Sequence, residues 1–213
     1  MTPQQVLDAS RNNLNALNDT FWTDTELLTK LYETMLQMSR ETQCIEASTT
    51  ITSVAGTQAY SRPTKAPEIW RVEFASAKLQ LIDYRQRDQI TFNDPTGQSG
   101  TPRYYLLYGD VITLYPTPVT AETITIYYYG EPAVPTASST LEIPSIFHDA
   151  LVSGLTARMT PKDLAHPLTA FWRDKWAVDL DSVRTYLKRR KRGDRFNIVN
   201  TEEVNLTTNF GIT

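Results

Sequence analysis

Side chains of the types that perform catalysis are few in this sequence of 213 residues, and they are not grouped. Cys44 is the one cysteine, and His148 and His166 are the two histidines. Two histidines and one thiolate cannot complete a common tetrahedral zinc site without carboxylates. The simpler interpretation is a buried thiol, a histidine within an amphipathic helix and a histidine that precedes a proline at a helix start.

Motifs of nucleotide-binding enzymes and hydrolases are incomplete or missing. Residues 97–100, with the sequence GQSG, resemble a glycine loop, but they lack the Lys-Ser/Thr pair of a P-loop and precede a strand-rich segment instead of a helix. No GxSxG nucleophile elbow is present, although the sequence alone does not exclude a triad assembled by folding. The adjacent carboxylates Glu202 and Glu203 lie in a segment with no pattern of a folded pocket. The sequence therefore predicts a protein that is not an enzyme and that needs no cofactor and no metal.

Aromatic side chains are concentrated between residues 104 and 129, where seven of the 11 tyrosines lie. Exposed rings bind sugars or bases by stacking, so a carbohydrate- or nucleic-acid-binding module is an alternative that the sequence leaves open. Neighbouring side chains on a strand point to opposite faces, so Tyr127, Tyr128 and Tyr129 cannot all line one site. One face is therefore predicted to be core or a contact between subunits.

Charge is unevenly distributed along the chain. The net charge is −3, but residues 184–195 contain seven basic residues and one acidic residue, Asp194. Such asymmetry indicates a partner surface or a channel wall, and a solvated helix end is the plain alternative, because cations there suit the helix dipole. The acidic isoelectric point of about 5.5 argues against a dedicated DNA-binding domain. The residues predicted to contact a partner or DNA are Lys188, Arg189, Arg190, Lys191, Arg192, Arg195, Phe196 and Phe210.

Helical patterns occur at both ends of the chain. A Thr2–Gln5 capping box with Pro3 at the first helical position predicts a helix to about Leu17, and a second box, Thr23–Glu26, predicts a helix that ends near Gln43. Helix is expected again from Pro144 until Pro161, and in a long segment, 167–192, with Gly193 as its C-cap.

The middle of the chain has the two-residue period of strands. Residues 45–60 predict a hairpin around Ala55-Gly56, and 68–74 and 123–129 predict single strands. Residues 83–100 are polar and end in a turn-rich loop. Gly109-Asp110 joins two β-rich runs as a type II′ hairpin, and Pro116 and Pro118 end the second run.

These patterns predict an α+β fold in which a helical bundle from the N- and C-terminal helices carries an inserted antiparallel β-module. We expect the helical unit to comprise residues 1–44 and 141–193, and the β-module residues 45–140. Residues 194–213 are expected to form an extended C-terminal tail, whose apolar residues cannot be buried by the tail alone. The N-terminal residues lack the pattern of a secretory leader, so none is expected, and no apolar run approaches the ~18 residues of a membrane span.

A series of short motifs resembles the adaptor, or head-to-tail connector, proteins of short-tailed bacteriophages. GTPRYY at 100–105 comes first, followed by YGDVITLYPTP at 108–118, TITIYYYGEP at 123–132 and IPSIFHDAL at 143–151. Each motif is weak alone, but their order and spacing agree with the family over roughly residues 65–190. The first helices and the tail match no motif of the family.

The resemblance implies a structural virion protein of the neck, assembled in the host cytoplasm, in a homo-oligomeric ring of about twelve subunits. It implies a helical part docked on the portal protein, a β-part that faces the tail nozzle or tail fibres, and genomic DNA passing through the ring during ejection. It implies no membrane contact and no catalysis. The family's motif residues are then structural: Gly109, Asp110, Pro116, Pro118 and Pro144. A nucleic-acid- or carbohydrate-binding tail module stays the alternative.

Overall fold

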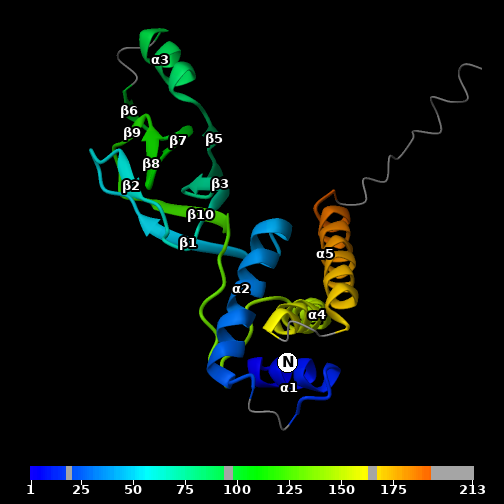
Figure 1. Ribbon diagram of the computed structural model, residues 1–213. Coiled ribbons are helices and arrows are strands. Elements are labelled where there is room, and N and C mark those ends of the chain that lie inside the picture. The colour runs from blue at the N-terminus through cyan, green and yellow to red at the C-terminus, as the bar shows by residue number, and fades with distance from the viewer. Residues whose placement is uncertain (18–20, 94–97, 163–166, 193–213) are drawn as a thin grey trace, which may run out of the picture.

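The computed structural model describes residues 1–17, 21–93, 98–162 and 167–192, which form a helical unit and a β-module (Figure 1). The helices are α1 (Pro3–Asn13), α2 (Asp24–Thr42), α3 (Tyr84–Asn93), α4 (His148–Met159) and α5 (Thr169–Arg192), with 3₁₀ turns η1 (Ser145–Phe147) and η2 (Thr160–Lys162). The longer strands are β1 (Glu46–Thr52), β3 (Glu68–Phe74), β7 (Tyr104–Tyr108), β8 (Val111–Tyr115) and β10 (Thr123–Tyr129). The shorter strands are β2 (Ala59–Ser61), β4 (Ala77–Lys78), β5 (Gln80–Leu81), β6 (Ser99–Gly100) and β9 (Thr117–Pro118). The predicted α+β class is confirmed.

Side-chain caps set the start of the first two helices. The Thr2 hydroxyl accepts from the Gln5 amide and the Gln5 side chain accepts from the Thr2 amide, so the predicted capping box forms. Helix α1 ends at Asn13, earlier than the predicted Leu17, because Asn15 adopts a left-handed backbone with φ of 53°. At α2, Thr23 accepts from the Glu26 amide, but the Glu26 carboxylate binds Lys162, so the second box is half formed.

Helices from both ends of the chain share one hydrophobic core. Leu7 of α1, Leu31 of α2, Leu155 of α4 and Leu180 of α5 are all buried in it. At Gly154 the helices approach so closely that an added Cβ would lie 2.6 Å from Thr34 of α2 and 2.8 Å from the Trp176 ring of α5. Pro144 precedes η1 and Pro161 lies in η2, at the two ends of α4, as predicted. Among the described residues, no helix has both the length and the hydropathy needed to cross a bilayer.

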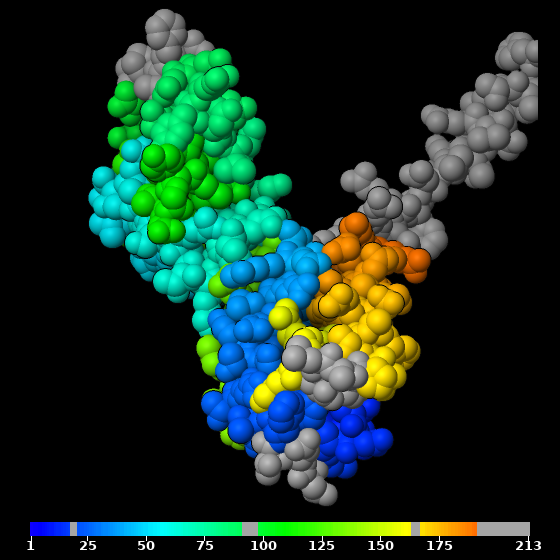
Figure 2. All heavy atoms as spheres, in the orientation of Figure 1, coloured from blue at the N-terminus to red at the C-terminus, as the bar shows by residue number. Residues whose placement is uncertain are grey.

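Two four-stranded sheets pack face to face around a second core. Their strand orders are β1-β10-β3-β4 and β2-β8-β7-β5. Ile126 and Val72 of the first sheet and Leu114 and Ile112 of the second are at most 1% exposed and belong to this core. Figure 2 shows this β-module as a lobe beside the helical unit. The structure thus has two cores, while the domain boundaries drawn from the sequence stay a prediction.

The hairpin predicted over residues 45–60 is wrong, because the two strands belong to different sheets. A turn does form, with the Thr57 amide donating to the Val54 carbonyl at 3.0 Å. However, β1 pairs with β10 and β2 pairs with β8. Ser53 fixes the corner, since its hydroxyl accepts from the Glu122 amide at 2.8 Å. The sequence pattern of a turn between strands is the same whether the strands pair with each other or cross between sheets.

Residues 83–100 contain a helix, α3, in addition to the expected loop. Asp83 caps it, because its carboxylate accepts from the Gln86 amide at 2.7 Å while the Gln86 side chain accepts from the Asp83 amide at 3.1 Å. This reciprocal Asp-x-x-Gln cap is the sequence signal that was missed. The module also contains two short parallel pairs, β5 with β7 and β6 with β9, so it is not wholly antiparallel.

Candidate interaction surfaces

The histidine and cysteine predicted to be structural are held inside the helical unit. His148 is buried, with its Nε2 atom 2.9 Å from the Ile143 carbonyl and its Nδ1 atom 2.9 Å from the amino group of Met1. Cys44 is buried and unoxidised. His166 lies outside the described residues. In the part of the chain that is described, no three His, Cys, Asp or Glu side chains are grouped so as to hold a metal ion.

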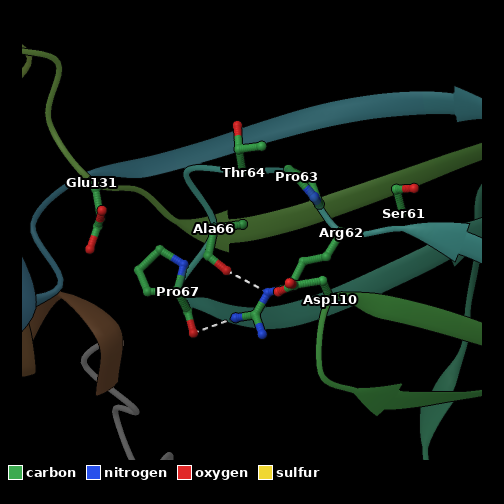
Figure 3. Close-up of a pocket in the computed structure, with 8 residues that line it drawn as sticks. All are labelled: Ser61, Arg62, Pro63, Thr64, Ala66, Pro67, Asp110 and Glu131. Carbon is green, nitrogen blue, oxygen red and sulfur yellow. Dashed lines mark hydrogen bonds between the residues drawn. The ribbon is translucent and has the colours of Figure 1, made fainter.

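The predicted hairpin motif forms and is anchored to the neighbouring loop. Gly109 has φ of 53°, while Asp110 is not among the residues with positive φ, which agrees with the type II′ turn. The Asp110 carbonyl accepts from the Arg62 amide at 2.8 Å. The Arg62 guanidinium in turn donates to the carbonyls of Ala66 and Pro67, beside a surface pocket of about 480 Å³ (Figure 3). These backbone contacts give the motif a structural explanation.

The two prolines after the hairpin differ in their positions. Pro116 follows the last residue of β8 through a cis peptide bond and ends that strand as expected. Pro118 was predicted to end the same run, but it lies in β9, where it pairs with Gly100. A proline fits there because β9 has a single partner strand and needs no second row of N–H donors.

The basic end of α5 lies beside the start of β1. Arg184 forms an ion pair with Glu41 of α2 at 3.0 Å, and Arg190 forms one with Glu46 of β1 at 3.6 Å. Lys188 and Arg189 are exposed. Lys191 and Arg192 belong to the last turn of α5, but their side chains lie outside the description. Arg195, Phe196 and Phe210 also lie outside the described residues, so the partner contacts predicted for the cluster stay a prediction.

The outer face of the first sheet carries an aromatic cluster. Trp70 of β3 is 45% exposed, and its ring centroid lies 5.5 Å from Tyr127 and 6.3 Å from Tyr129. The Arg71 guanidinium lies 5.9 Å from the Tyr127 ring, and the Tyr127 hydroxyl donates to Glu73 at 3.3 Å. Tyr128 instead packs against the core between the sheets. The alternation predicted for the three tyrosines is therefore present.

A second apolar surface lies at the end of the β-module where α3 is found. Tyr108, at the tip of the hairpin, is 68% exposed, and its ring packs edge-on against Tyr84 of α3 at 5.6 Å. Leu81 and Val111 are exposed nearby on adjoining strands. The Arg87 guanidinium covers the Tyr84 ring at 4.9 Å. Sequence analysis missed this surface because α3 brings Tyr84 to the hairpin only after folding.

No described strand pairs with the outer side of β1 in the first sheet. β1 is the outermost strand, and its register with β10 runs without interruption from Glu46↔Tyr129 to Thr52↔Thr123. The Ser53 amide donates to the Glu122 carbonyl, and the Ile45 carbonyl accepts from the Gly130 amide. Because hydrogen bonding alternates along an antiparallel pair, the odd-numbered residues bond to β10. The even-numbered residues 46, 48, 50 and 52 therefore direct their N–H and C=O groups outward.

A comparison with models of protein families matches residues 1–201 to the SU10 adaptor protein family. The match covers both helical segments, the whole β-module and the first residues of the tail. No curated protein matches the chain.

Proposed function

Because the chain belongs to the SU10 adaptor protein family, we propose that this phage structural protein joins the portal at the capsid vertex to the tail. The single observation that supports this most is the extent of the family match, which includes the helical unit and the β-module together. A chain used as a connector needs surfaces at two separate places, and the structure has exposed apolar groups on both parts. Its position would be the neck of the virion, after assembly in the host cytoplasm.

The helical unit is the part that we assign to the portal. Leu17 and Phe21, in the α1–α2 connection, are exposed, and so are Phe171 and Val178 on α5. Large apolar side chains on a surface favour burial against a partner. The β-module would then face the tail nozzle or tail fibres, with Tyr84 and Tyr108 at its far end as the aromatic anchors.

We further propose a homo-oligomeric ring of about twelve subunits around the path of the DNA. A ring repeats each surface charge around its axis, so the exposed Lys188 and Arg189 would form a basic belt. Such a belt would attract either DNA phosphates or acidic portal side chains, and both ionic contacts weaken with added salt. Two nearby arginines, Arg184 and Arg190, form ion pairs with Glu41 and Glu46 of the same chain. These pairs hold the basic end of α5 against α2 and β1.

The test is to mix the purified chain with the portal protein of its phage and to determine the mass and symmetry of the product by light scattering and cryo-electron microscopy. We expect a discrete ring of this chain on the portal. The chain alone is the control, because connectors that assemble on a portal need not form rings without one. An absence of association across a range of salt concentrations contradicts the proposal.

A nucleic-acid- or carbohydrate-binding tail module is the second candidate, and the exposed Trp70–Tyr127–Tyr129 cluster favours it. Aromatic faces with neighbouring charged groups are typical of sugar and base stacking. In this case Trp70→Ala abolishes binding to host glycans or single-stranded DNA and leaves the portal mixture unchanged. Phe171→Ala on α5 is the matched control, because it removes an exposed ring from the other unit.

A further inference from the structure

A pocket lies at the side of the β-module, where the chain passes from one sheet to the other. β4 pairs with β3 only at Glu73 and Phe74, and the next strand, β5, belongs to the second sheet. The first half of β3 therefore has no strand beside it on this side in the described structure. The pocket has a volume of about 530 Å³ and is lined by residues 69–70 and 78–81 and by Tyr105.

A bulge in β3 places the Trp70 ring at this pocket. The register between β3 and β10 shifts between Tyr127 and Tyr128, so Trp70 has no opposite residue. Bulges redirect a side chain and are common beside functional sites. The Trp70 side chain is 45% exposed, whereas the other three tryptophans are at most 9% exposed. Its ring already contacts Tyr127 and Tyr129, so it is a held aromatic surface on which a ligand ring can stack.

Tyr105 forms the inner wall of the pocket, and its hydroxyl group has no hydrogen-bond partner. The side chain is 3% exposed, and no hydrogen bond to its hydroxyl is present in the part of the chain that the structure describes. Buried hydroxyl groups are normally hydrogen-bonded, because an unpaired one is costly. Since Tyr105 lines the pocket, an oxygen atom of a ligand is the partner that this hydroxyl lacks.

Two exposed polar side chains, Lys78 and Gln80, lie at the mouth of the pocket. Glu73 is opposite Lys78 in the register, but its carboxylate already binds Arg71 and the Tyr127 hydroxyl. Among the described residues Lys78 forms no ion pair, so its ammonium group is available to an anionic ligand. The Gln80 amide supplies both a donor and an acceptor.

This set of groups fits a sugar that carries a carboxylate. A pyranose ring presents an apolar C–H face to an aromatic ring and hydroxyl groups to amide and phenol side chains. A carboxylate on the same sugar forms a charge-assisted contact with a lysine. A nucleic-acid strand instead needs several cations along its phosphates, and Lys78 is the one basic residue of the lining. The Trp70–Tyr127–Tyr129 cluster then offers a surface on which a chain of sugars continues.

We propose that this pocket binds a hexuronic acid residue of an acidic polysaccharide. The sugar ring lies on Trp70, its carboxylate pairs with Lys78, and its hydroxyl groups bond to Gln80 and Tyr105. The inference deepens the second candidate function, on which it rests, because it names the class of sugar and the residues that select it. It requires neither a ring of subunits nor the portal.

Tryptophan fluorescence measures the binding, because Trp70 is the one exposed tryptophan. The purified chain is titrated with a galacturonic acid tetramer and with the methyl ester of that tetramer, which keeps the rings and removes the charge. We expect a saturable change in fluorescence with the acid, and binding of the ester that is about fivefold weaker. A single-stranded DNA oligonucleotide is the third ligand and is expected to bind more weakly than the acid.

Variants measured by calorimetry assign the contacts. Trp70→Ala should weaken binding of the tetramer by at least roughly 30-fold, and Tyr105→Phe, which keeps the ring, by about fivefold. Lys78→Gln should make the acid and its ester bind equally. Lys188→Gln, which removes an exposed lysine from α5, is the matched control and should change neither affinity. Thermal unfolding of each variant confirms that the chain is folded.

The possible results separate this inference from the proposed functions. Equal affinity of the unmodified chain for the acid and the ester overturns the assignment of a carboxylated sugar and leaves a carbohydrate-binding module intact. Tighter binding of the oligonucleotide, or no binding of either tetramer, overturns the sugar site itself. The mixture of chain and portal is measured separately with Trp70→Ala, and its assembly yield tests only the connector function.

Discussion

Two residues of the β-module, Gly109 and Tyr105, show how turn geometry and burial affect stability. Gly109 has a φ of 53°, in the left-handed region that is unfavourable for residues with a Cβ atom, and an added Cβ would meet no atom within 4 Å. Gly109→Ala is therefore expected to lower the free energy of unfolding by about 1 kcal/mol, measured by chemical denaturation. Gly100→Ala, also without neighbours but without positive φ, is the control. Equal effects of the two variants would contradict the backbone explanation.

Tyr105 is buried in the core of the β-module, and burial changes the ionisation of its hydroxyl. Desolvation raises the pKa of its hydroxyl above the ordinary value of 10.0. Above pH 10.0 the unfolded chain loses this proton before the folded protein does, so the free energy of unfolding falls as pH rises from there toward the raised pKa. Below pH 10.0 the group has no such effect. We expect Tyr105→Phe to reduce this alkaline loss in denaturation series between pH 9 and 11. Tyr108→Phe, at an exposed site, should retain it.

At the scale of elements, the contact of α4 with α2 and α5 depends on a missing side chain. Gly154→Ala places a methyl group 2.6 Å from Thr34 and 2.8 Å from the Trp176 ring. Overpacking of this kind lowers the free energy of unfolding by about 1–3 kcal/mol. The better helix propensity of alanine offsets up to about 1 kcal/mol of this loss. We expect a net loss of stability by thermal unfolding. Arg158→Ala is the control, because it removes only a partly exposed ion pair between α4 and Glu33 of α2. We expect it to lower the unfolding temperature less than Gly154→Ala does.

Elements with local signals were predictable from the sequence. Three features have sequence signals that lie within a few neighbouring residues: the Thr2 capping box, the strand 123–129 and the Gly109-Asp110 hairpin. All three formed as expected. The pairing of β1 with β10 was not predictable, because about 70 residues separate the two strands and no residue near β1 indicates which strand it pairs with. The candidate surfaces divide in the same way. The basic run was visible in sequence, while the Tyr84–Tyr108 surface and the outer edge of β1 exist only after distant segments meet.

At the scale of the whole molecule, the tail is a separable part. Deletion of residues 194–213 removes no side chain from either core of the described structure. We expect the truncated chain to unfold at the same temperature as the full chain, and to attach to the portal with reduced yield, because the apolar residues of the tail need a partner surface. Co-sedimentation with portal and calorimetry measure the two quantities. An unchanged yield of assembly is the outcome that contradicts this role.

Both ends of the chain contribute to the helical core, while the β-module is continuous between them, and this arrangement sets an order of events during translation. Every strand of the described structure has left the ribosome once residue 129 has emerged, whereas the apolar faces of α1 and α2 are covered only after α4 and α5 have been made. The helices that are made first are thus among the last to pack. Until then their apolar faces are exposed, and we expect a chaperone to bind them. Arrested nascent chains from which residue 129 has left the exit tunnel, but α4 has not, should accordingly protect the β-module from protease and leave α1 and α2 open to cleavage.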